Sequence, residues 1–75
     1  MTTIQNADQS YEQAVAAKEI AAQALYRAEL AVHDAHQTHV DQWIGAAHDR
    51  LHDAVIRYLA AESAVATLQE HAVAA

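Results

Sequence analysis

Alanine recurs at every seventh position through the first half of the chain, at Ala7, Ala14, Ala21, Ala28 and Ala35. Seven residues span two turns of an α-helix, so these alanines form one stripe along a helix. The residue three places before each alanine is large: Ile4, Tyr11, Lys18, Leu25 and Val32. The two series are typical of the d and a positions of a heptad repeat.

The second half of the chain repeats this scheme in a different phase. Its a positions are Ile44, Leu51, Tyr58, Val65 and Ala72, and its d positions are Ala47, Ala54, Ala61, Leu68 and Ala75. A change of phase requires a turn, and Thr38 and Asp41 have the spacing of a capping box at that point. We therefore expect one domain, 1–75, with a helix at about 4–37, a turn at about 38–42 and a helix at about 43–73.

An antiparallel pairing of the two helices sets large residues against alanines. Pairs whose residue numbers sum to 79 place Leu25 against Ala54 and Ala28 against Leu51. Alternation of large and small side chains allows two helices to approach closely. The predicted fold is therefore an all-α, antiparallel two-helix hairpin with an alanine-rich heptad seam. Lys18 interrupts the apolar seam. Either its aliphatic stem packs in the seam while its charge stays in water, or it is a polar residue that fixes the register of the two helices.

A chain of 75 residues without cysteine has a thin core and no disulfide to support it. A single hairpin also leaves apolar residues beside the seam uncovered. We expect these residues to form a second interface, most simply in a homodimer that makes a four-helix bundle. The predicted partner interface comprises Val15, Tyr26, Leu30, Val55, Ile56, Leu59 and Val73.

The formal net charge of −6 disfavours binding to nucleic acid or to an anionic membrane. An acidic chain could instead occupy a basic site on a larger protein, as inhibitors from phages or mobile elements do. Arg27, Arg50 and Arg57 should lie at one level over small alanines. In one interpretation these arginines form a patch that binds an anion or an acidic partner. In the other, their aliphatic stems cover the alanines and their charged groups stay in water.

Four histidines should gather on the partner side of the hairpin, near the turn: His33, His36, His48 and His52. His48 and His52 have the H-x-x-x-H spacing that can hold a transition metal, and an all-histidine site suits Zn, Ni or Cu. A pH-responsive interface is a second interpretation. The third is that these residues are polar edges of an interface and that the protein has no cofactor.

The sequence contains no recognisable set of nucleophile, base and orienting residue. We therefore expect a protein that is not an enzyme, has no catalytic residue and acts through protein–protein interaction. The segment 1–9 has neither the basic nor the apolar region of a cleavable signal peptide, and no apolar run reaches membrane-spanning length. A cytoplasmic protein is the expectation, and export without a cleaved signal is the alternative.

Trp43-Ile44-Gly45 places a W-x-G motif near the expected bend. In this respect the chain resembles the small secreted helical hairpins that carry a Trp-x-Gly turn and travel through type VII secretion. Tyr58 and Glu62 form a Y-x-x-x-E that is similar to the export signal of that family, although there it follows the second helix. Members of the family are usually longer. The resemblance implies a secreted, dimeric partner protein without enzymatic activity.

Overall fold

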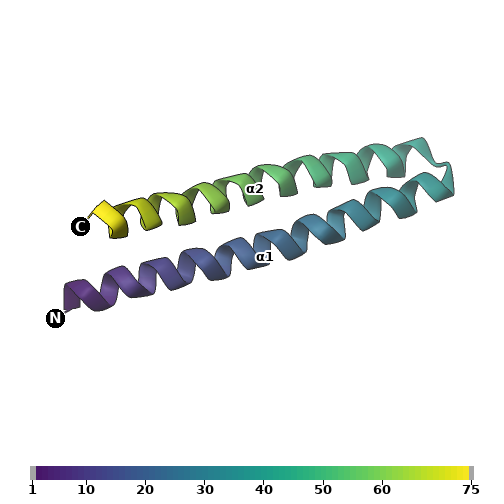
Figure 1. Ribbon diagram of the computed structural model, residues 1–75. Helices are drawn as coiled ribbons and strands as arrows, with labels where there is room; N and C mark the ends of the chain where they lie inside the picture. The colour runs from purple at the N-terminus through teal and green to yellow at the C-terminus, as the bar shows by residue number, and fades with distance from the viewer. Residues whose placement is uncertain (1, 75) are drawn as a thin grey trace.

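The computed structural model describes the backbone of residues 2–74 and the side chains of residues 9–71. Two helices, α1 (Thr2–Thr38) and α2 (Asp41–Ala74), run antiparallel and contact each other (Figure 1). No strand occurs between residues 2 and 74. The prediction of an all-α, two-helix hairpin is confirmed.

The turn consists of only His39 and Val40, so both helices extend beyond the expected segments. His39 has a φ of 58°, the left-handed conformation that ends many helices but is usually adopted by glycine or asparagine. The Val40 carbonyl accepts hydrogen bonds from the backbone N–H groups of Trp43 and Ile44, both at 3.0 Å. Val40 is therefore the residue that caps the start of α2.

Thr38 and Asp41 flank the turn, but they do not form the expected capping box. Thr38 is the last residue of α1, and its hydroxyl donates to the Ala35 carbonyl at 2.6 Å. The same hydroxyl oxygen accepts the Val40 N–H at 3.2 Å. A capping box needs the threonine at the N-cap, the residue directly before the helix, and in α2 that residue is Val40.

Burial follows the heptad seam. Among residues 9–71 the buried apolar residues are Ala28, Ala47, Ala54 and Val65, all at predicted a or d positions. The other seam residues in this range are half-buried, including the charged Lys18, except Tyr11, which is exposed. Near the open end, the Gln69 side chain donates a hydrogen bond to the Tyr11 hydroxyl at 3.0 Å, which agrees with the predicted register. Seam positions Ile4, Ala7, Ala72 and Ala75 lie outside the described side chains.

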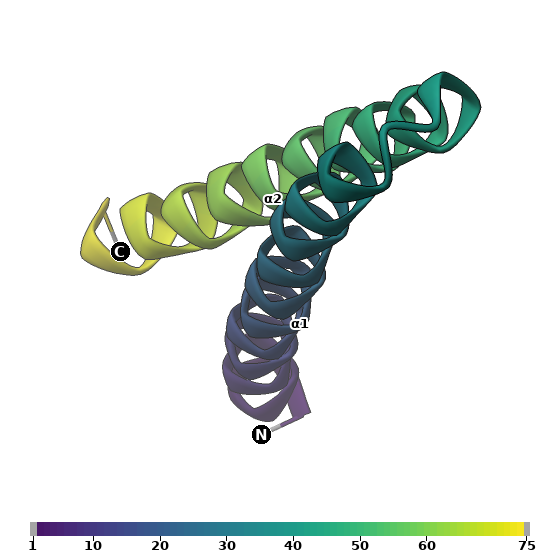
Figure 2. The same cartoon turned by 90° about the vertical axis from the view of Figure 1, so that its right-hand side faces the viewer.

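The hairpin is a thin rod. Its extents are 57 × 17 × 13 Å and its radius of gyration is 16.9 Å. A compact chain of this length has a radius of gyration of about 11 Å. The helices lie close together beside the turn and diverge toward the termini (Figure 2). Within residues 2–74, neither helix has a stretch long and apolar enough to cross a membrane.

Candidate functional site

No polar or charged side chain between residues 9 and 71 is buried, so the candidate sites lie on the surface of the rod. The two helices present three features there. One is a face with large exposed apolar residues, one is a hollow bordered by arginines, and one is a histidine pair beside the turn.

The apolar face, as we define it, consists of Tyr26 and Leu30 on α1 and Val55, Ile56 and Leu59 on α2. All five are exposed, and Tyr26 and Leu59 expose 63% and 55% of their surface. Tyr26, Val55 and Leu59 lie at b and e positions beside the seam, and Leu30 and Ile56 lie at f positions on the outer side of each helix. None of the five positions faces the other helix. Val15, also predicted here, is half-buried against the seam. Val73 lies outside the described side chains.

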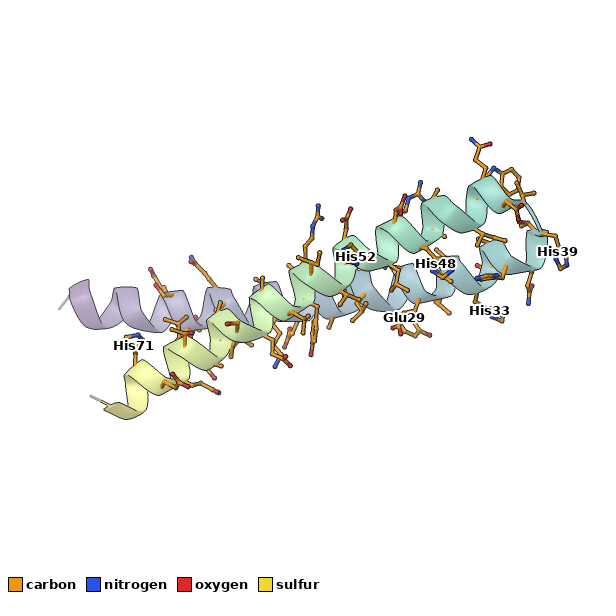
Figure 3. The ribbon with its side chains drawn as sticks, turned by 90° about the horizontal axis from the view of Figure 1, so that it is seen from above. Glu29, His33, His39, His48, His52 and His71 are labelled. Atoms are coloured by element: carbon orange, nitrogen blue, oxygen red, sulfur yellow. The ribbon has the colours of Figure 1, made fainter. Side chains whose placement is uncertain are left out.

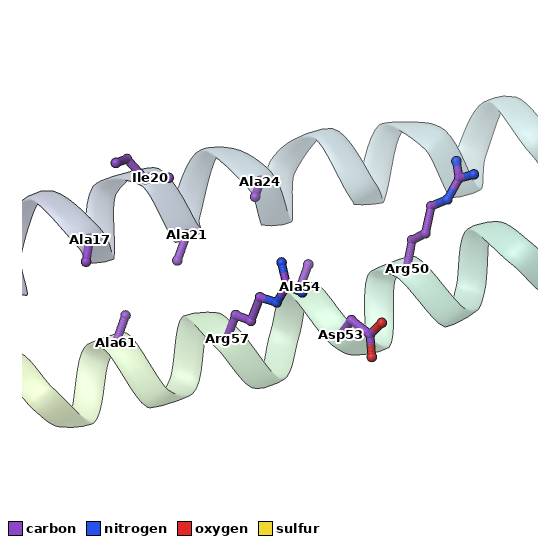
Figure 4. Close-up of a pocket in the computed structure, with 9 residues that line it drawn as sticks. All are labelled: Ala17, Ile20, Ala21, Ala24, Arg50, Asp53, Ala54, Arg57 and Ala61. Atoms are coloured by element: carbon purple, nitrogen blue, oxygen red, sulfur yellow. The ribbon is translucent and has the colours of Figure 1, made fainter.

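A hollow of about 610 Å³ lies between the helices, and alanines form its floor. Figure 4 shows Arg50 and Arg57 rising from α2 toward α1 at its edge. The other lining residues are Ala17, Ile20, Ala21, Ala24, Asp53, Ala54 and Ala61. The hollow exists because alanines on both helices leave no side chain to fill the space between the backbones.

A second hollow, of about 340 Å³, continues this one toward the turn and shares Arg50. Trp43 and Thr38 border it near the turn. The three arginines predicted to cluster are thus partly brought together. Arg50 and Arg57 border the same hollow, whereas Arg27 lines neither of the two.

Ile20, Trp43 and Asp53 also line these hollows and were not among the predicted site residues. Ile20 exposes 68% of its surface, the most of the large apolar residues among those described. The sequence marks this side by a second alanine series, Ala17, Ala24 and Ala31, which lies three residues after the seam series and beneath the predicted arginines.

The four predicted histidines do not converge on one point. His36 and His48 approach each other across the helices, with their Nε2 atoms 3.0 Å apart. His33 instead accepts a hydrogen bond from the Gln37 side chain, at 3.2 Å. Figure 3 shows His52 farther along α2, His39 at the turn and His71 at the opposite end of the rod.

His33 lies one turn before His36 on α1, and its ring bonds to Gln37 on the same helix, whereas the His36 ring reaches α2. Between residues 9 and 71 no group of three or more histidine, aspartate or glutamate side chains is placed to hold a metal ion. Of the four predicted histidines, the structure brings His36 and His48 together.

The W-x-G motif lies in α2 and not in the turn itself. Trp43 is the third residue of α2 and is largely exposed, and Gly45 is helical. A Cβ added to Gly45 would meet nothing within 4 Å, so no close contact requires glycine there. No family model matches the chain, and no curated protein or solved structure matches it. The resemblance to Trp-x-Gly hairpins stays a prediction.

Proposed function

We propose that this chain is a non-enzymatic protein that acts by association, and that it pairs with a second copy of itself through the apolar face. The supporting observation is that five large apolar side chains, contributed by both helices, are exposed to solvent. Large apolar groups gain free energy when they leave water, at about 25 cal/mol per Å² of buried surface.

The amount of exposed surface supports this proposal. The hairpin exposes 5883 Å², whereas a compact monomer of 8.1 kDa exposes about 4,500 Å². The excess is about 1,400 Å². A standard protein–protein interface buries about 1,600 Å² in total, counted over both partners. One such interface would cover about half of the excess exposed surface of each chain in the pair.

The shape of the hairpin is also suited to pairing. Two helical rods that pack side by side form a four-helix bundle, in which each hairpin covers the apolar face of the other. A two-fold arrangement uses the same face on both copies and closes after two chains. The pair would then have a core between the hairpins in addition to the two thin seams within them.

Charge substitutions on opposite sides of the rod test this proposal. Leu59→Asp places a carboxylate in the centre of the proposed interface, and Ile20→Asp places one on the side of the alanine-floored hollow. Both residues are exposed in the hairpin, so neither change disturbs the seam. Sedimentation velocity should show a monomer for Leu59→Asp and an unchanged dimer for Ile20→Asp, with circular dichroism confirming that both variants remain helical.

The reverse result, dissociation by Ile20→Asp alone, would show that the copies pair through the hollow and not through the apolar face. A wild-type chain that sediments as a monomer at every micromolar concentration tested would refute self-association.

A further inference from the structure

The pair of His36 and His48 is a contact between the two helices that joins residues on opposite sides of the turn. The ring centroids are 5.2 Å apart and the ring planes meet at 84°. The two Nε2 atoms are much closer, at 3.0 Å. The rings therefore meet at their Nε2 tips, where one ring donates an N–H and the other accepts.

From this geometry we propose that His36 and His48 form a two-histidine site for a late first-row divalent metal ion such as Ni²⁺, Cu²⁺ or Zn²⁺. Imidazole nitrogen is a preferred ligand of all three ions. The proposal concerns a single hairpin and does not depend on self-association.

The spacing of the two nitrogens agrees with this proposal. A metal–nitrogen bond of about 2.0–2.1 Å, with an angle of 90–110° between the two bonds, separates the nitrogens by about 2.8–3.4 Å. The distance of 3.0 Å between the Nε2 atoms lies within this range. Both histidines are exposed, so their rings can turn to direct the Nε2 lone pairs at an ion and the remaining ligands can be water.

The positions of the two residues give the site a structural consequence. His36 lies in the last turn of α1 and His48 in the first half of α2. An ion held by both would link the helices beside the turn, where they already lie close together (Figure 2). Because the link exists only in the folded hairpin, the metal should raise the unfolding temperature.

Calorimetric titration of the untagged chain with NiCl₂ and with ZnCl₂ tests the proposal, together with thermal unfolding in the same salts. The wild type should bind one ion per chain and unfold at a higher temperature with metal. His36→Ala and His48→Ala should each weaken binding by at least about tenfold, since changes to groups outside the ligand set already cost 10–100-fold. Both variants should lose the metal-dependent rise in unfolding temperature.

His33→Ala, His52→Ala and His71→Ala are the matched controls, because each removes one exposed histidine and leaves the pair intact. They should bind as the wild type does. Three results would overturn the proposal: no binding by the wild type, equal weakening in the control variants, or a stoichiometry of one ion per two chains. The last would indicate an ion held between copies.

Discussion

Replacing Ala28 with leucine tests whether the alanines of the seam determine how closely the helices pack. Ala28 exposes 9% of its surface and lies on the side of α1 that faces α2. Leucine adds three carbons at a position that α2 already covers and that lines neither hollow. We expect the helices to be forced apart or the leucine into a strained rotamer, at a cost of about 1–3 kcal/mol.

This cost can be converted into an unfolding temperature. For a domain of 60–100 residues, 1 kcal/mol corresponds to about 4–8 °C. Ala28→Leu should therefore lower the midpoint of thermal unfolding by roughly 4–24 °C. Circular dichroism at 222 nm is a suitable assay, at one fixed protein concentration because the midpoint of a self-associating protein depends on concentration.

Ala60→Leu is the control, because it makes the same chemical change at an exposed position of α2. Leucine and alanine have similar helix propensities, so this variant should unfold near the wild-type temperature. If Ala28→Leu unfolded at or above the temperature of Ala60→Leu, the seam would have room for a larger side chain. The alanines of the seam would then not determine how closely the helices pack.

Three further predictions concern the stability of the hairpin. Leu25→Ala and Leu51→Ala should each lower the free energy of unfolding by about 2 kcal/mol, as measured by urea unfolding. This value is near the low end for a leucine-to-alanine change, because both leucines are only half-buried. Gly45→Ala should raise it by about 0.5–1 kcal/mol in the same assay, since an added Cβ meets nothing and alanine favours the helix. His39→Gly should also raise it, by up to about 1 kcal/mol, because φ at this position is 58° and glycine adopts that conformation without strain. A loss of stability in either of the last two variants would contradict the description of the turn and of the start of α2.

The seam was predictable because burial in a two-helix protein depends almost entirely on periodicity. Ala28, Ala47, Ala54 and Val65 are buried for the same reason that they recur in heptads, namely that they face the other helix. The change of phase between the halves also indicated where the chain reverses.

The details of the turn were not predictable from local preference. Helices commonly end at a glycine in the left-handed conformation, and the single glycine of this chain lies inside α2. His39 adopts that conformation because the seam on either side fixes where the chain must reverse. Packing along two long helices outweighs the preference of one residue.

The histidine pair was only partly predictable. The helical wheel places four histidines on the same side, but the contact depends on which of these side chains is directed toward the other helix. His36 and His48 meet this condition, and His33 binds Gln37 on its own helix. A helical wheel shows the angle of each side chain around its own helix, but it does not show the distance between side chains on two helices.

Self-association is the central claim, and the molar mass of the wild-type chain in solution tests it most directly. Light scattering coupled to size exclusion, repeated over a range of micromolar concentrations, measures this mass independently of the elongated shape. We predict a mass of twice 8.1 kDa that falls only on strong dilution. A mass of 8.1 kDa at every concentration would contradict the claim and leave the apolar face without the partner proposed for it.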